Sequence, residues 1–546
     1  MKFLLLKLRF SLCALTLLFS TTSHAQVSGQ IIAEGDGSPI AGARVRIQAD
    51  LSSPEATTDA NGMFSLPINP TSQIGIAAYK PFVLQSGVQN FATNVEQVAG
   101  PGGGLTIALP RIPAHNAVGY QPPSSTSCAG CHGSQRSDWL TSRHAGAAVN
   151  PWVLDLFSGT GTPGGGAGYV FKNTHGVGES GFCATCHAPM QDVFAPGTVL
   201  LDQVSTPAGR DGVTCLACHQ VAEVDPARIN GLHHVNKTSY YFPDAGGLTT
   251  FHVFGALPDV GTDVMINMFN PLFKEARLCA SCHQYNNPTT NAPGQSTYAE
   301  WLASPFAVAG PNFRTCQNCH MPEALSSGTI ASGGVTRPAG QRHRHTFIGA
   351  TASTLPAAIK LNVIPQIIGN ELQVQAQVVN QGAGHSFPTG VSIRNAILVL
   401  EVKRGNALLA QSFGSTVPGY ADDDVAGVQP GDLSGKPGKG FAKVLQGRIN
   451  GQGAVQSPVL FIDAEGVLSS TTIPAGTTDT STYRFTLPAG VAAGEVSISV
   501  RLLYRRAFRA LAVTKGWTIT PSGGPIEVEV AQVSINGEGL LRNGFE

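Results

Sequence analysis

The sequence shows no excess of charge of either sign. Its 34 Lys and Arg residues balance 34 Asp and Glu residues, so the formal net charge at pH 7 is zero over 546 residues. Proteins that hold nucleic acid through its phosphates need clustered Lys and Arg side chains that release counterions. No region of this chain is basic enough for that, which argues against a nucleic-acid partner.

Long apolar runs are missing after the first 25 residues, so the sequence predicts no transmembrane segment. The N-terminus has Lys2, Lys7 and Arg9, then an apolar stretch, then a small-x-small cleavage site at residues 23–25. This order is typical of a secretory signal peptide over residues 1–25, whose apolar run is too short for a membrane anchor. We therefore expect export to the periplasm, the cell surface or the extracellular space.

Long helices are not expected either, because 64 Gly and 36 Pro make up 100 of the 546 residues. Such a composition favours turns, short strands and loops. Apolar alternation between turn residues predicts a multidomain fold with β-sandwiches at both ends. The predicted parts are an N-terminal β-sandwich (26–110), a central loop-rich, mostly α region (111–350), a C-terminal Ig/fibronectin-like β-sandwich (351–535) and a short tail (536–546). Short helices are expected at 135–147 and 298–304.

No cysteine is left over once the signal peptide, with Cys13, is removed. The other ten form five pairs, each followed at once by histidine: Cys128, Cys131 and His132; Cys183, Cys186 and His187; Cys215, Cys218 and His219; Cys279, Cys282 and His283; Cys316, Cys319 and His320. C-x-x-C-H is the attachment motif of c-type haem, in which two thiols bond the porphyrin and the histidine ligates iron. Disulfides would not need a histidine after every pair, and zinc ribbons suit this pattern poorly. The sequence therefore predicts five haem c groups with iron.

Five haems share the 240 residues of the central region, or 48 residues each. That is too little chain for a conventional core, so the porphyrins themselves must form much of it. They must also lie close together, and closely packed haems exchange electrons.

The sixth iron ligand decides whether such a protein is a carrier or a catalyst. Nine histidines of the mature chain are not proximal ligands. We expect distal ligands among His144, His175, His233, His234, His252, His345 and His385, with only one of the adjacent pair binding. His115 and His343 are interpreted as loop residues, and no methionine is expected to bind iron.

One short segment occurs twice in the central region. Trp139, Leu140, Ser142 and Ala145 of the first copy correspond to Trp301, Leu302, Ser304 and Ala307 of the second, but Phe306 stands where the first copy has His144. The segment is interpreted as a packing unit beside haem, with Phe306 against a porphyrin. The haem there would then take His345 or His385, or stay open.

Several longer motifs extend the C-x-x-C-H pattern. They are W-x-x-S-x-H-A after the first motif, G-V-T-C-x-x-C-H at 212–219, T-C-Q-x-C-H-M-P at 315–322, H-x-F-x-G-A at 345–350 and G-H-S-F-P-T-G at 384–390. As a set they resemble the cytochrome c-552/c-554 class of multihaem cytochromes. The resemblance implies loop-rich haem packing, bis-histidine haems, electron transfer, and a His144 that serves a haem other than that of its own motif.

The N-terminal region resembles the carboxypeptidase-regulatory-like β-sandwich modules, which are not catalytic. The matching residues are Gly29, Pro39, Ile40, Gly42, Ala43, Val45, Thr58, Asp59, Gly62 and Phe64.

The expected function is electron transfer along closely packed, mostly bis-histidine haems, with other redox proteins or extracellular electron acceptors as partners. Two alternatives stay open. One is an oxidoreductase with one open haem that acts on a small nitrogen or sulfur compound. The other is a self-associating subunit of a conductive surface assembly. A carrier is favoured over an enzyme, and no catalytic residue is assigned.

Overall fold

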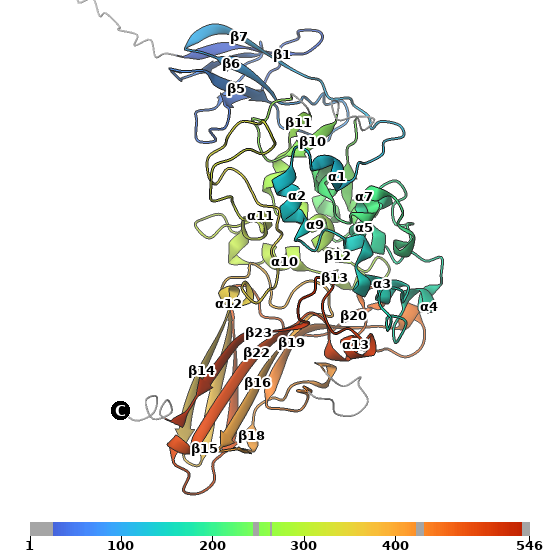
Figure 1. The fold of residues 1–546 in the computed structure, drawn as a ribbon, viewed down its shortest axis with the longest axis vertical. Coiled ribbons are helices and arrows are strands. Elements are labelled where there is room, and N and C mark those ends of the chain that lie inside the picture. The colour runs from blue at the N-terminus through green and yellow to red at the C-terminus, as the bar shows by residue number, and fades with distance from the viewer. Residues whose placement is uncertain (1–25, 244–250, 263–264, 422–430, 538–546) are drawn as a thin grey trace, which may run out of the picture.

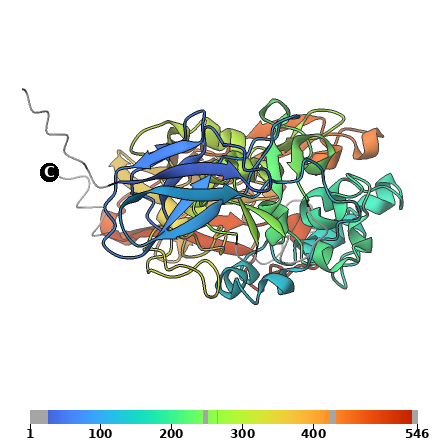
Figure 2. The ribbon, with the colours of Figure 1, turned by 90° about the horizontal axis from the view of Figure 1, so that it is seen from above.

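The computed structural model describes residues 26–243, 251–262, 265–421 and 431–537. The expected signal peptide and all but two residues of the expected tail lie outside this range. Figure 1 shows β-sheets at both ends of the molecule and a loop-rich helical part between them. Figure 2 looks down on the N-terminal strands, with green and teal helical segments extending beyond them to one side.

The N-terminal strands form two sheets that share one core. The strands are β1 (Val27–Ala33), β2 (Arg44–Ile47), β3 (Ala56–Thr57), β4 (Met63–Leu66), β5 (Ile74–Tyr79), β6 (Asn94–Val98) and β7 (Gly102–Leu109). They pair in the orders β4-β1-β7 and β3-β2-β5-β6. Strand β1 alternates buried and half-buried side chains, so that Ile31 meets Val45 and Ile76 of the other sheet in one hydrophobic cluster. Gly29 is required between β1 and β7, because a Cβ there would lie 1.8 Å from the Leu105 carbonyl oxygen.

The central region is built from short helices: α1 (Ser125–Cys128), α2 (Gly133–Leu140), α3 (Pro151–Phe157), α4 (Phe171–His175), α5 (Cys183–His187), α6 (Pro189–Asp192), α7 (Pro207–Arg210), α8 (Cys215–His219), α9 (Arg277–His283), α10 (Thr297–Leu302) and α11 (Cys316–His320). Three two-stranded sheets accompany them: β8 (Val221–Val224) with β9 (Thr238–Tyr240), β10 (His252–Gly255) with β11 (Ile266–Phe269), and β12 (Tyr285–Asn286) with β13 (Pro293–Gln295). The region is therefore loop-rich as expected but less purely helical than "mostly α". Within the described ranges, no helix is long and apolar enough to cross a membrane.

The helix expected at 135–147 is shorter than predicted. It ends at Leu140, and the chain then turns, with the Ser142 hydroxyl accepting a hydrogen bond from the His144 amide at 3.2 Å. Gly146 adopts a left-handed conformation at φ 70°, which no continuing helix permits. His144 consequently lies on a loop rather than on a helix.

The C-terminal strands are longer and enclose the largest apolar core. They are β14 (Ile359–Ile368), β15 (Glu371–Asn380), β16 (Asn395–Arg404), β17 (Ala407–Leu408), β18 (Gln411–Phe413), β19 (Gly438–Gln446), β20 (Gly466–Ser470), β21 (Thr478–Thr486), β22 (Val496–Arg505) and β23 (Glu527–Ile535), with α12 (Leu355–Ala358) and α13 (Arg509–Thr514). Two sheets result, β14-β15-β21-β18 and β20-β19-β16-β22-β23. Strand β15 alternates strictly between buried and half-buried residues, and its buried side joins the core with β16 and β22.

Polar contacts hold the C-terminal part against the central region. The fully buried Lys515 ammonium donates to the carbonyl oxygens of Asp155, Gly165 and Tyr169 at 3.1, 2.6 and 2.6 Å. Trp517 adds a hydrogen bond of 2.6 Å to the Asp155 carboxylate. Because a buried ammonium without partners would be costly, this docking is specific.

A second buried contact joins the N-terminal sheets to the centre. The Asp259 carboxylate forms an ion pair with Arg337 at 2.8 Å and accepts a hydrogen bond from the Ala49 amide at 2.6 Å. Both side chains of the ion pair are almost completely buried. The three parts are thus joined by more than their linkers.

Candidate haem centres

Each C-x-x-C-H motif forms a single turn at a helix end. Helices α5, α8 and α11 consist of the motif alone, α9 ends with it, and the first motif bridges α1 and α2. Residues three and four positions apart lie on one side of a helical turn, so both thiols and the histidine face the same way. All ten cysteines are free thiols. Among the described residues, no three His, Cys, Asp or Glu side chains converge as a zinc site would need.

The five motif histidines are oriented through Nδ1. Four of them contact backbone carbonyl oxygens: His132 with Ile330 at 2.8 Å, His187 with Ala147 at 3.0 Å, His219 with Phe254 at 2.7 Å, and His320 with Ile348. The fifth, His283, lies 2.9 Å from the side-chain amide of Gln295. A neutral imidazole that donates from Nδ1 keeps the Nε2 lone pair for a metal, which is the usual arrangement of metal-binding histidine.

A single large cavity connects the motifs. It measures about 2020 Å³ and is lined by nine of the ten motif cysteines and by all five motif histidines. Sites for one small ligand are typically about 300–1,000 Å³, so this space is larger than one such ligand needs. The donors and the space together fit several covalently attached porphyrins.

Three pairs of histidine rings lie across this cavity at similar separations. The ring centres are 6.2 Å apart for His144 and His283, 6.3 Å for His219 and His345, and 6.3 Å for His320 and His385. An imidazole nitrogen binds a metal at about 2.0–2.1 Å and lies roughly 1.1 Å from its own ring centre, so two imidazoles on one iron have ring centres about 6.2–6.4 Å apart. The three observed separations match this value.

Burial keeps these non-motif rings uncharged. It lowers the pKa of His144, His345 and His385 to about 4 in each case. Because desolvation penalises the imidazolium, all three are neutral at pH 7. The neutral ring is the form that binds iron.

Two of the other candidates use both ring nitrogens elsewhere. His175 lies 3.0 Å from the Asp463 carboxylate through Nε2 and 2.9 Å from the Thr174 hydroxyl through Nδ1. His233 contacts the Tyr240 hydroxyl at 3.2 Å and the Thr238 hydroxyl at 2.9 Å. In these positions neither ring has a nitrogen left for iron.

His234 and His252 differ from His175 and His233. His234 lies 3.0 Å from the buried Asp192 carboxylate through Nδ1, while its Nε2 is buried without a hydrogen-bond partner. A carboxylate behind a histidine is the common second partner of a metal ligand. His252 is a buried residue of strand β10, paired with Ile266 of β11.

His343, which the sequence interpretation set aside, also lines the cavity. Its Nδ1 lies 2.6 Å from the Met321 carbonyl oxygen, as in the motif histidines. The usable sequence signal was the H-x-H spacing with His345, since alternate residues of an extended segment share a face.

The two copies of the repeated segment make the same hydrogen bonds. Trp139 donates from Nε1 to the Val213 carbonyl oxygen, and Trp301 to that of Arg314, both at 2.8 Å. Each acceptor stands two positions before the first cysteine of a haem motif. The segment is therefore a packing unit against a motif, the third motif for the first copy and the fifth for the second.

The turn that carries His385 packs on the second copy. A Cβ at Gly384 would lie 3.5 Å from the Trp301 ring and 3.7 Å from Phe306, in ordinary contact. Phe306 itself lines the cavity. A histidine from between β15 and β16 is thus brought to the copy that has none of its own.

No protein-family model and no curated protein matches this sequence. Among solved structures, the chain is similar to a penta-haem cytochrome c552 from Thermochromatium tepidum, with 22% identity and a TM-score of 0.49 over 76% of this chain and 98% of that one. A second likeness is to the Fcho1 Mu homology domain of Danio rerio with bound Eps15 peptide, with 11% identity and a TM-score of 0.12 over 34% of this chain and 44% of that one. Neither likeness is close enough to support a function, which has to be inferred from this chain's own residues.

Proposed function

We propose that this chain is an exported c-type cytochrome that binds five haem c groups and transfers electrons between redox partners. The observation that carries the proposal is the set of three histidine pairs at the separation of one shared iron, inside a cavity lined by the five attachment motifs. A bound haem c supplies a one-electron iron couple, and histidine on both faces keeps the iron six-coordinate. No acid, base or nucleophile of the chain is needed for this function.

The ring pairs support a proposed assignment of three irons. His283 and His144 hold one, His219 and His345 the second, and His320 and His385 the third. His385 comes from the turn between β15 and β16, so the C-terminal strands contribute a ligand and are part of the cytochrome.

The remaining two irons belong to His132 and His187, and we assign their sixth ligands from loop packing. The loop that leads to His343 contacts the first motif twice, since Ile330 accepts from His132 and the Ser332 amide donates to the Cys131 carbonyl oxygen at 2.8 Å. We therefore assign His343 to the first motif.

His234 is assigned to the second motif. It belongs to the π-helical turn His233–Lys237, which packs against α5, the helix of that motif. Its buried Nε2 has no hydrogen-bond partner, and iron would satisfy it.

Close spacing of the attachment points supports transfer from haem to haem. Thiols of different motifs lie close enough to shift one another's pKa: Cys215 raises that of Cys128, Cys186 raises that of Cys282, and Cys316 raises that of Cys279. The chain thus joins the first motif to the third, the second to the fourth and the fourth to the fifth, which keeps each electron-transfer step short.

The test counts the haems of the purified protein and measures the spin state of their irons. We expect five covalent haems per chain by mass and pyridine haemochrome, and low-spin signals from all ferric irons in electron paramagnetic resonance (EPR). Fewer than five haems would contradict the cofactor assignment. A full complement with a substantial high-spin signal would contradict the purely electron-carrying function.

One observation favours a second candidate, an oxidoreductase with one open haem. Among the described residues, the ring contacts give neither His132 nor His187 a histidine at the one-iron separation. An open iron at either position would bind a small nitrogen or sulfur compound. A high-spin signal that nitrite, hydroxylamine or sulfite converts to low spin, together with turnover of that compound, would establish this function instead.

A further inference from the structure

Three arginines from separate parts of the chain line the cavity, and two of them stand at the ends of neighbouring strands, where Asn395 pairs with Arg505. Arg143 follows α2, Arg394 precedes β16 and Arg506 follows β22. Burial and the charges of Arg143 and Arg394 lower the pKa of Arg506 to about 10. Like charges that lower one another's pKa repel, and an anion among them would relieve that repulsion.

No described carboxylate supplies that anion, because none forms an ion pair with any of the three. Arg394 donates to the Thr389 carbonyl oxygen at 3.2 Å, and Arg506 donates to those of Ala350 and Pro525 at 2.6 and 3.4 Å. Backbone carbonyls leave the positive charges uncompensated. By contrast, the almost completely buried Arg337 has a carboxylate partner.

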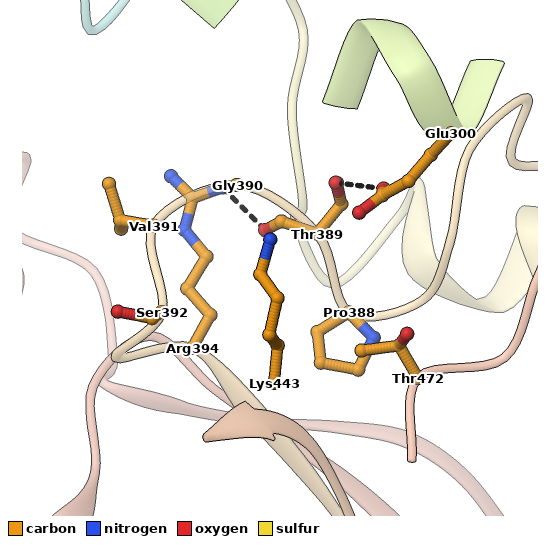
Figure 3. A pocket seen from close by; sticks show the side chains of 9 residues that line it. All are labelled: Glu300, Pro388, Thr389, Gly390, Val391, Ser392, Arg394, Lys443 and Thr472. Atoms are coloured by element: carbon orange, nitrogen blue, oxygen red, sulfur yellow. Dashed lines mark hydrogen bonds between the residues drawn. The ribbon is translucent and has the colours of Figure 1, made fainter. Parts of the chain in front are cut away.

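The neighbouring acidic side chain, Glu300, is engaged elsewhere. Figure 3 shows it reaching toward Thr389, with Lys443 between it and Arg394. Its carboxylate accepts from the Thr389 hydroxyl at 2.5 Å and from the Ser386 amide at 3.3 Å. The described carboxylates therefore leave the cluster with capacity for a further anion.

The backbone makes specific room for Arg394. Gly390 has φ +91°, and a Cβ there would lie 2.5 Å from a terminal guanidinium nitrogen of Arg394. Only glycine allows this conformation and this contact together. Gly390 is the last residue of the G-H-S-F-P-T-G segment, so one short turn supplies both His385 and the space for an arginine.

The cluster borders one particular iron site. Arg143 immediately precedes His144, whose ring packs on Phe347, three residues before the Ala350 carbonyl oxygen that accepts from Arg506. His144 and His283 form the pair whose ring centres are 6.2 Å apart. The haem of that pair is the one attached to Cys279 and Cys282.

We propose that Arg143, Arg394 and Arg506 form a carboxylate-binding site that takes the propionates of the haem attached to Cys279 and Cys282. The inference rests on the proposed function, because it requires a haem there. Guanidinium groups bind carboxylates through two parallel hydrogen bonds, and three of them match two propionates in charge and number of donors. Positive charge beside an iron favours its reduced state, so the site raises the potential of this haem.

The test compares Arg143→Gln, Arg394→Gln and Arg506→Gln with Arg484→Gln, a surface variant on β21 whose ion pair with Glu371 is 3.7 Å long. Redox titrations followed by EPR resolve the individual haems. For each cluster variant we expect one haem to become about tenfold harder to reduce in equilibrium constant, a fall of about 59 mV for one electron. The other four haems and the Arg484→Gln protein should keep their potentials.

Other outcomes separate the possible errors. Five low-spin haems with unchanged potentials in all three variants would overturn the propionate site and leave the proposed function intact. A wild-type potential that shifts with added acetate or nitrite, and no longer does so in the variants, would show an exchangeable anion instead and also overturn it. Fewer than five haems in the wild type would be a failure of the proposed function itself. If Arg394→Gln or Arg506→Gln does not fold, two other variants test the propionate site. Arg394→Lys keeps the charge but loses the paired donors, and Arg143→Gln changes an exposed residue.

Discussion

The two copies of the W-L-x-S segment share their packing and differ in what they offer to iron. In both, a tryptophan donates to the carbonyl two residues before a haem motif, and a serine hydroxyl accepts from the residue at the variable position at 3.2 Å. That residue is His144 in one copy and Phe306 in the other. At the second copy, the turn with His385 lies against the segment. Packing and ligation are therefore separable, and a ligand lost from one element can come from another part of the chain.

The largest effect is expected from His385→Ala. It removes the histidine whose ring centre is 6.3 Å from that of His320 and leaves Phe306 beside an iron with no sixth ligand. We expect one of the five ferric irons to become high-spin in EPR and to bind added cyanide or imidazole.

The matched control is His115→Ala, at an exposed histidine of a loop. It should leave all irons low-spin. An unchanged spectrum in His385→Ala as well would mean that another residue serves the second copy, and the comparison of the two copies would have to be abandoned.

The second largest effect is expected from His144→Phe, which tests the first copy of the segment. His144→Phe makes its variable position identical to that of the second copy. The segment that packs on His144 through Phe347 has its own histidine, His345, opposite His219. We expect one high-spin iron, that of His283, with the Trp139 packing retained. If the iron stays low-spin, His144 is not its ligand; a loss of two low-spin irons would show that the substitution disturbs the neighbouring centre too.

A smaller, purely spectroscopic effect distinguishes the copies in the unmodified protein. The planes of His144 and His283 are inclined by 58°, whereas those of His320 and His385 are inclined by 13°. The angle between axial imidazole planes governs the g-anisotropy of low-spin ferric iron, and a large angle gives a larger maximum g value. We expect the signal that disappears in His144→Phe to have a larger maximum g than the one that disappears in His385→Ala; equal values would contradict these ring orientations.

The attachment motifs could be predicted from sequence because they are local: both thiols and the histidine lie within five residues. The distal ligands were harder to predict, because they depend on contacts with residues far along the chain. His175 was also a candidate ligand, but its Nε2 lies 3.0 Å from the carboxylate of Asp463, nearly 300 residues later. His343 was interpreted as a loop residue, although its spacing to His345 places both residues on one face of an extended segment.

The same difference between local patterns and long-range contacts applies to the fold. The alternation of Glu371–Asn380 specifies a strand with one buried face, and the structure has that strand. The way the parts dock could not be read in advance. Lys515 is an ordinary lysine in the sequence, and only the three carbonyl oxygens of the 155–169 segment explain why it is completely buried.

The smallest effect concerns the shared packing itself. Trp139→Phe and Trp301→Phe each remove the indole hydrogen bond to a carbonyl oxygen and keep an aromatic ring. Trp139 is only 5% exposed, whereas Trp301 is half-buried. An unpaired carbonyl costs more where water cannot reach it, so we expect a loss of unfolding free energy of about 1–3 kcal/mol for Trp139→Phe and about 0.5–1.5 kcal/mol for Trp301→Phe. Denaturant unfolding of the haem-loaded proteins measures both. Equal losses, or a larger loss at Trp301, would show that the indole hydrogen bond does not carry the packing that the two copies share.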